Sequence, residues 1–72
     1  MKEITYLGRK FTVADDVKWV ATDLDGDIYS YTTKPYIYGA WWDTKTVCDH
    51  YLGNYDNDKQ YKEWAESLME IK

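Results

Sequence analysis

Polar and apolar residues alternate along much of the first 42 positions, a pattern that predicts a body made of β-strands. The alternation runs on both sides of Leu7 and Gly8, which is typical of a hairpin. It resumes after a short polar turn and continues to a pair of adjacent tryptophans. We therefore expect strands within residues 3–13 and within residues 17–42.

The strongest local signal is the acidic run DLDGD at residues 23–27. An Asp-Gly step between two alternating runs is typical of a β-hairpin, because Gly26 adopts the positive φ that the turn requires. A three-residue loop over 24–26 would gather aromatic residues on one face, where cross-strand aromatic pairs stabilise a sheet. A two-residue loop over 25–26 would shift the register by one residue and split these aromatics between the faces. We therefore expect the three-residue loop, which pairs Asp23 with Asp27, Ala21 with Tyr29 and Trp19 with Tyr31, and leaves Val20, Ile28 and Ser30 on the other face.

The pattern breaks at the next Lys-Pro step, because Pro35 has no N–H to donate to a strand ladder. Residues 36–42 alternate again and predict one further strand, in which Gly39 is a candidate bulge. On a single strand, large apolar side chains would occupy both faces: Tyr36, Tyr38 and Trp42 on one, Ile37 and Trp41 on the other. The stretch 44–52 fits either a last short strand or an irregular crossing, and residues 53–56 fit a loop.

The C-terminal stretch has the period of an amphipathic helix. Its large apolar residues recur at i, i+3, i+7 and i+10, which makes one apolar stripe of Tyr61, Trp64, Leu68 and Ile71. Asn57 is a good N-cap, and Gln60 three residues later is placed to reach back to it as in a capping box. We therefore predict a helix over Asn57–Ile71. The expected fold class is α+β: one domain over residues 1–72, with a small antiparallel sheet of four to five strands and this one C-terminal helix packed on one face.

Composition and charge narrow the classes of function. Eight Tyr, four Trp and one Phe make 18% of the 72 residues aromatic, whereas disordered chains are poor in such residues. No apolar run reaches the roughly 18 residues of a membrane span, and the first residues lack the apolar core of a signal peptide. Because small secreted domains usually carry several disulfides and Cys48 is the only cysteine, we expect a cytoplasmic protein. A net charge of −4 disfavours nucleic acid as a partner, since such binding relies on Lys and Arg.

The acidic run at residues 23–27 suggests a calcium site, but its spacing does not fit an EF-hand loop. With Gly26 at the sixth position of an EF-hand loop, Ala21 and Thr32 would occupy the first and twelfth positions, where the loop needs acidic ligands. Cys48 and His50 are too few for a zinc site, and two residues apart on a strand they stand about 7 Å from each other. The sequence contains no Gly-rich phosphate loop and no nucleophile elbow. We therefore expect no enzyme, no catalytic residue, no metal and no cofactor.

The aromatic surplus is the most informative feature of the sequence. One interpretation is that long loops cover these aromatic residues, or that the tyrosines are simply half exposed. The other is a recognition surface, because Tyr and Trp are enriched among the residues that carry binding energy at interfaces. Acidic residues would then steer a basic partner and tyrosines would hold it, so the predicted partner-binding residues are Asp23, Asp25, Asp27, Tyr29, Tyr36 and Tyr38. Since one helix covers one face of a sheet, a homodimer that buries part of the other face is a further hypothesis.

Four short strings of the chain form a pattern: WVATDLDGDIY at residues 19–29, KP at 34–35, WW at 41–42 and WAESL at 64–68. This pattern resembles small phage and prophage proteins of unassigned function. The resemblance implies an accessory protein that binds and blocks a host factor, which includes bacterial defence systems such as CRISPR, restriction and abortive infection. Since the pattern carries no catalytic motif, it assigns no active residue.

The leading hypothesis is a phage-encoded inhibitor that binds a host protein with a basic surface, stoichiometrically, in the cytoplasm of the host cell. The alternative is an accessory protein that binds single-stranded nucleic acid by stacking bases on aromatic residues of the sheet. That alternative needs nearby cations, for which the candidates are Arg9, Lys10, Lys18, Lys34 and Lys45. A virion accessory protein without an inhibitory role is a third hypothesis.

Overall fold

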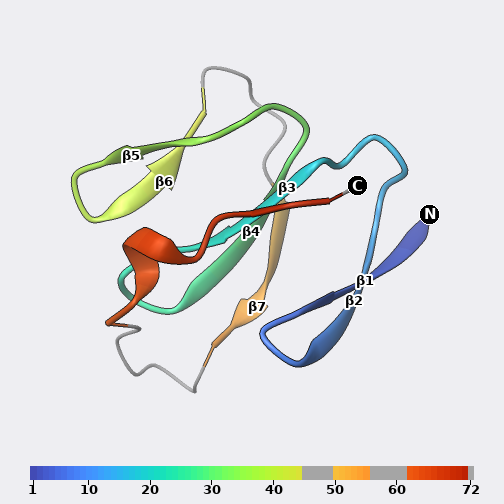
Figure 1. Cartoon of the computed structure of the whole chain (residues 1–72), viewed down its shortest axis with the longest axis horizontal. Coiled ribbons are helices and arrows are strands. Elements are labelled where there is room, and N and C mark those ends of the chain that lie inside the picture. The colour runs from blue at the N-terminus through green and yellow to red at the C-terminus, as the bar shows by residue number, and fades with distance from the viewer. Residues whose placement is uncertain (45–49, 56–61, 72) are drawn as a thin grey trace.

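The computed structural model describes residues 1–44, 50–55 and 62–71, and over these residues the chain is mostly β. Strands account for 53% of the described residues and helical turns for 5%, so the expected α+β class is wrong. Figure 1 shows the elements in chain order, which are β1 (Lys2–Tyr6), β2 (Arg9–Val13), β3 (Trp19–Thr22), β4 (Asp27–Tyr31), β5 (Tyr36–Tyr38), β6 (Trp41–Asp43), β7 (His50–Asn54), the 3-10 turn η1 (Trp64–Glu66) and β8 (Met69–Glu70).

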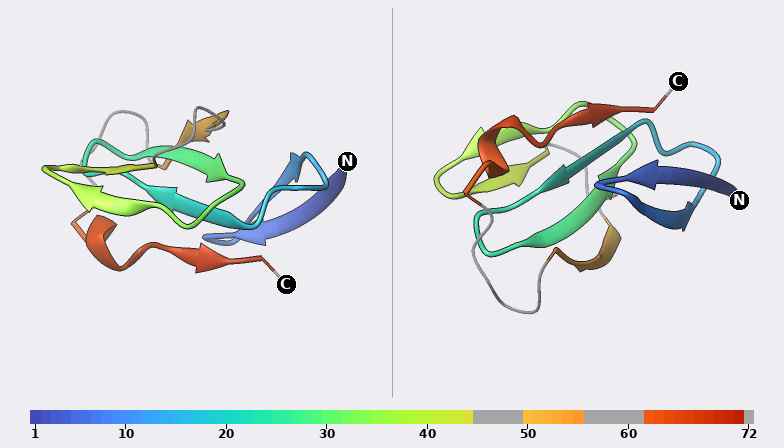
Figure 2. Two further views of the ribbon diagram at one scale, coloured as in Figure 1. Left: turned by 90° about the horizontal axis from the view of Figure 1, so that it is seen from above. Right: turned by 60° about the horizontal axis from the view of Figure 1, so that its bottom comes forward.

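Over the described residues, the strands form three antiparallel sheets. The central sheet has the order β7-β4-β3-β8, and two hairpins, β1-β2 and β5-β6, pack on its opposite faces. Figure 2 shows these hairpins on opposite sides of the central strands. Hairpins cover both faces, whereas we expected one helix to cover one face. The homodimer hypothesis is argued from a sheet face left uncovered by the helix, and the structure removes that argument. The homodimer itself stays a prediction.

The first two hairpins follow their predicted patterns. β1 and β2 pair across a turn in which Leu7 and Gly8 both have positive φ, 51° and 74°, as a type I′ turn requires. β3 and β4 have the register that the three-residue loop predicts, with Trp19 opposite Tyr31. Gly26 has a φ of 90° in that loop. For β3 and β4, the Asp-Gly step together with the grouping of aromatic residues on one face is therefore sufficient to set the pairing.

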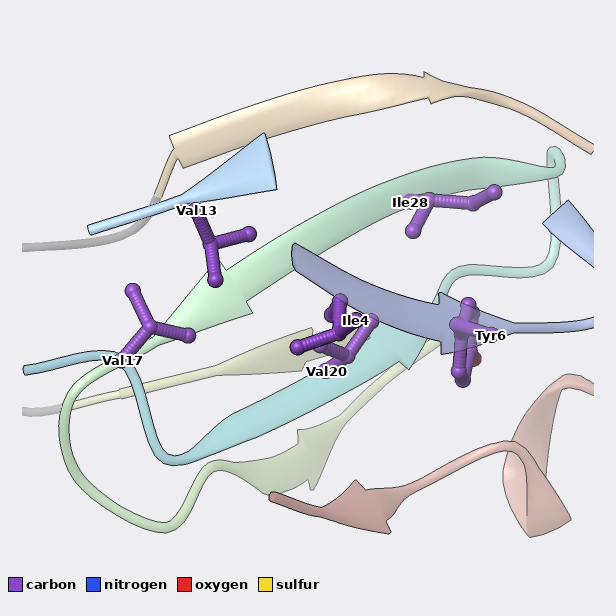
Figure 3. Close-up of a cluster of buried hydrophobic side chains, with 6 residues drawn as sticks. All are labelled: Ile4, Tyr6, Val13, Val17, Val20 and Ile28. Atoms are coloured by element: carbon purple, nitrogen blue, oxygen red, sulfur yellow. The ribbon is translucent and has the colours of Figure 1, made fainter. Parts of the chain in front are cut away.

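Mostly aliphatic side chains form the first core, between the β1-β2 hairpin and one face of β3 and β4. Figure 3 shows its buried members, which are Ile4, Tyr6, Val13, Val17, Val20 and Ile28. Val20 and Ile28 come from the face that the hairpin register predicts for them. The Tyr6 hydroxyl donates to the Ser67 carbonyl oxygen at 2.9 Å and lies 2.8 Å from Thr22 Oγ1. This buried hydroxyl is therefore satisfied within the core.

Aromatic side chains dominate the second core, on the opposite face of the same strands. Ala21, Tyr31 and Trp42 are buried there, and partly buried side chains pack around them: Trp19, Tyr29, Trp64 and Leu68. The gathering of Trp19, Tyr29 and Tyr31 on one face is confirmed. Trp42 anchors the β5-β6 hairpin to η1, because its indole Nε1–H donates to the Trp64 carbonyl oxygen at 3.0 Å.

The predicted helix over Asn57–Ile71 is wrong for its described part. Residues 57–61 lie outside the described residues, and from residue 62 onward the chain forms η1 and β8. The expected apolar stripe splits, because Trp64 and Leu68 pack in the second core whereas Ile71 packs against the first. β8 pairs with β3, whose edge offers backbone hydrogen bonds. These long-range contacts override the local helical period.

The stretch 36–42 is a hairpin and not the single strand that its alternation predicts. β5 and β6 are joined by a two-residue turn at Gly39 and Ala40, in which Gly39 has a φ of 66°. A glycine at the first turn position is typical of a type II′ turn. The chain reverses there, so Trp41 lies opposite Tyr38 and shares its face, whereas the single-strand prediction separated them.

Residues 50–52, at the described end of the stretch 44–52, belong to strand β7. Of the two interpretations, a last short strand is right from His50 onward, and Gly53 and Asn54 belong to this strand and not to the predicted loop. Arg9 of the β1-β2 hairpin donates from Nη1 to the Asn54 carbonyl oxygen at 2.8 Å, which ties that hairpin to β7. Cys48 lies outside the described residues.

Candidate partner-binding site

A groove of about 480 Å³ lies between the β3–β4 turn and the β5-β6 hairpin. We call it the acidic groove, because aspartates line it together with aromatic side chains. Its lining residues are Asp23, Leu24, Asp25, Asp27, Tyr29, Ala40, Trp41, Trp42 and Asp43. None of these lining residues is Lys or Arg, so the groove presents negative charge beside aromatic surface.

Hydrogen bonds hold the turn that carries Asp25 and Asp27. The Asp27 N–H donates to Asp25 Oδ1 at 3.1 Å, a local bond that favours the turn. From β7, the Asn54 side-chain amide donates to Asp27 Oδ1 at 3.1 Å. The Tyr55 N–H donates to the Gly26 carbonyl oxygen at 2.7 Å. The turn is thus held from within and by Asn54 and Tyr55 at the end of β7, so the backbone that carries these carboxylates is fixed in the free protein.

Asp23 is part of the framework of the groove. It is 9% exposed, and its Oδ1 accepts a hydrogen bond from the Trp42 N–H at 2.7 Å. Beside it, the Leu24 N–H donates to the Ala40 carbonyl oxygen at 3.2 Å. These two bonds join the β3–β4 turn to the β5-β6 hairpin. The sequence grouped Asp23 with exposed steering acids, whereas in the structure Asp25 is exposed and Asp23 is buried.

Exposed aromatic residues form what we call the aromatic face of the β5-β6 hairpin: Tyr36, Tyr38 and Trp41. They are 41%, 59% and 47% exposed, respectively. The rings of Tyr38 and Trp41 lie with their centroids 5.9 Å apart. Asp43 is opposite Tyr36 in the hairpin, and both Asp43 and Trp41 line the acidic groove. The aromatic face and the acidic groove therefore form one continuous surface.

The predicted partner-binding residues lie in these two adjoining places. The acidic groove is lined by Asp23, Asp25, Asp27 and Tyr29, whereas the aromatic face holds Tyr36 and Tyr38. Tyr29 also packs edge-on against Tyr51 of β7, with ring centroids 5.5 Å apart. The sequence prediction misses Trp41 and Asp43. The signal that finds them is the Gly-Ala step at residues 39–40, which brings β6 alongside β5.

The carboxylates of the groove do not converge on one point. Among the described residues, no group of three or more His, Cys, Asp or Glu side chains is placed to hold a metal ion. Within the described ranges, no helix is long and apolar enough to cross a membrane.

Comparison of the chain with protein-family models, with curated proteins and with solved structures finds no match. The functional proposal below therefore starts from the acidic groove and the aromatic face.

Proposed function

We propose that the protein binds a basic segment of another protein in the acidic groove and holds it on the aromatic face. The observation that carries this proposal is the placement of Asp25, Asp27 and Asp43 beside the exposed ring of Trp41, in a groove whose described lining residues include no Lys or Arg. Carboxylates attract a basic partner during the encounter, and aromatic rings supply contact area. An Arg or Lys side chain suits both features, because it pairs with carboxylates and packs on aromatic rings.

We further propose that this binding blocks a host factor. The resemblance of the four strings within residues 19–68 to small phage and prophage proteins supports a partner in the host cytoplasm, such as a defence protein. An acidic surface suits the basic groove in which a nuclease holds its nucleic acid. Inhibition is then stoichiometric, because the bound protein occupies the groove that the nucleic acid needs. No residue of the chain acts catalytically in this proposal.

The alternative of single-stranded nucleic acid draws less support from the geometry. Asp43 adjoins the aromatic face, and a carboxylate repels the phosphates of a strand stacked there. Of the candidate cations, Arg9 and Lys10 belong to the β1-β2 hairpin, which Figure 1 shows well apart from the β5-β6 hairpin. Lys18 is exposed just before β3, and Lys34, two residues before β5, lies over the Trp19 ring at 5.5 Å from its centroid. Lys45 lies outside the described residues. Protein binding is therefore the function that we favour.

The test is a titration of the protein with an octa-arginine peptide. The NMR chemical shifts of the backbone amides are measured at each peptide concentration. We expect saturable shifts in the groove and the aromatic face, with an affinity that falls as salt is raised. The variant D25N/D27N/D43N removes charge and keeps the side-chain acceptors, and it should weaken binding at least tenfold.

The matched control is D16N/E3Q/E70Q, which removes the same charge from exposed positions outside the groove lining. We expect it to change the affinity less than threefold. An equal loss in both variants would show that affinity follows net charge alone, and it would overturn the groove as the site.

A further inference from the structure

A second cavity, of about 260 Å³, opens between the end of the β1-β2 hairpin and strands β4 and β7. The residues that matter for its chemistry are Thr12, Val13, Ala14, Ser30, His50 and Leu52. Val13 and Leu52 also belong to or pack against the first core, so the cavity continues that core toward the surface. It is lined by none of the residues of the acidic groove. It is therefore a site independent of the proposed function.

Ser30 is the unusual residue of this cavity. It is 1% exposed, and its Oγ is buried and has no hydrogen-bond partner among the described residues. It lies on β4 opposite His50 of β7, and both residues line the cavity. A buried hydroxyl without a partner is costly, so native structures rarely keep one without a reason. Ser30 lines the cavity, and since its hydroxyl has no described partner to give up, a rotation about its Cα–Cβ bond toward the cavity would break no hydrogen bond.

The size and charge of the cavity restrict the ligand. A cavity of about 150 Å³ holds benzene, so 260 Å³ has room for one ring with a substituent. None of the described side chains that line it is an acid, a lysine or an arginine, and His50 is the titratable side chain among them, so the described lining offers no side chain of fixed charge. The α-ammonium of Met1, which also lines the cavity, pairs with Asp15 Oδ1 at 3.0 Å. A charged ligand would lose its hydration without a counter-charge, so the ligand is neutral.

We propose that this cavity binds a neutral, single-ring molecule that carries one hydroxyl, of which phenol is the simplest. The ring packs against Val13 and Leu52, and the hydroxyl pairs with Ser30 Oγ once this side chain has turned toward the cavity, where it can both donate and accept a hydrogen bond. The same hydroxyl selects between ligands, because a ring without a polar group leaves Ser30 unpaired.

The experiment titrates the full chain with phenol and, in parallel, with toluene, and follows the backbone amides by NMR. We expect both probes to shift amides at the end of β2, in β4 and in β7. Phenol should bind on the order of three- to tenfold more tightly than toluene, as one net hydrogen bond provides. Shifts spread over the whole surface, or no saturation with either probe, would overturn the site.

Ser30→Ala is the decisive variant. It removes a hydroxyl that has no partner in the fold, so the protein should stay folded. We expect it to lower the affinity for phenol to that for toluene and to leave toluene binding unchanged. The matched control, Thr5→Ala, removes a hydroxyl from an exposed position of β1 and should change neither affinity. An unchanged preference for phenol in Ser30→Ala would overturn the role of this hydroxyl.

Two further measurements test whether the probes bind inside the cavity and whether the natural ligand is a free molecule or a side chain of a partner. Ala14→Phe places a ring at the wall of the cavity and should abolish the binding of both probes without changing octa-arginine binding. Loss of octa-arginine binding together with phenol binding would mean that the two sites are not independent. Tighter binding of N-acetyl-tyrosinamide than of phenol would point to a partner's tyrosine side chain, and it would overturn a free small molecule as the ligand.

Discussion

The two cores of the protein differ in chemistry and in how completely they are closed. Among the described residues, the first core holds six buried, mostly aliphatic side chains. The second holds three buried side chains, and the partly buried side chains packed around them are Trp19, Tyr29, Trp64 and Leu68. The first core stabilises the fold through buried apolar area. The second also depends on specific hydrogen bonds, such as those that Asp23 and Trp64 make with Trp42. We therefore expect the first core to contribute most of the stability and the second to position the proposed binding surface.

The largest effect should come from the first core. Ile28 is completely buried, so Ile28→Ala should lower the free energy of unfolding by about 2–5 kcal/mol. A loss of that size removes much of the stability of a small domain. Urea unfolding followed by circular dichroism measures it. Ile37→Ala deletes the same atoms from a side chain that is 48% exposed and should cost far less; equal losses would contradict the division between core and surface.

The next largest effect should come from the link between the β3–β4 turn and β6. Asp23→Ala leaves the Trp42 N–H buried without its acceptor, which should cost about 1.5–3 kcal/mol. Asp23→Asn keeps an oxygen at the same place and should cost less than half as much. Thermal melting compares the two variants, and amide shifts in β6 report whether the groove keeps its shape. If both variants lose the same stability, the charge matters and the acceptor does not.

A smaller effect should come from the turns of the two outer hairpins. Gly39 has a φ of 66°, and a Cβ there would meet only Trp41 ring atoms at 3.8 Å. Gly39→Ala therefore costs only the left-handed backbone strain, about 1–2 kcal/mol. Gly8→Ala, at a φ of 74° with open space around it, should cost a similar amount. The two variants should differ in octa-arginine binding, because we expect Gly39→Ala to weaken it and Gly8→Ala to leave it unchanged. Equal affinities of the two variants would show that the β5-β6 turn does not contribute to the site.

The sequence was sufficient where the information is local. The Asp-Gly step at 25–26 marks the β3-β4 hairpin, and the grouping of aromatic residues on one face selects its register, which places Tyr29 and Ser30 on their correct faces. Four of the predicted partner-binding residues meet in the groove for the same reason, since they lie in or beside this one hairpin.

The rest depends on contacts between distant residues. Ser67 Oγ accepts a hydrogen bond from the Thr22 N–H at 2.9 Å, across 45 positions of the chain, and this bond helps to hold the segment that the helical period assigned to a helix. The Asp23–Trp42 bond spans 19 positions, and no local pattern shows that Asp23 is buried. Gly39 illustrates a third limit, because a glycine in an alternating run fits a bulge as well as a two-residue turn.

The smallest effect on stability should come from the aromatic face, where the effect on binding is large. Trp41 is 47% exposed, so Trp41→Ala should change the free energy of unfolding by no more than about 0.5 kcal/mol. Octa-arginine binding should weaken, because the variant removes the ring that lies in both the groove and the aromatic face. Trp41→Phe keeps an aromatic ring and should recover part of that affinity. A large drop in melting temperature would place Trp41 in the second core, whereas unchanged binding would leave the carboxylates alone to hold the partner.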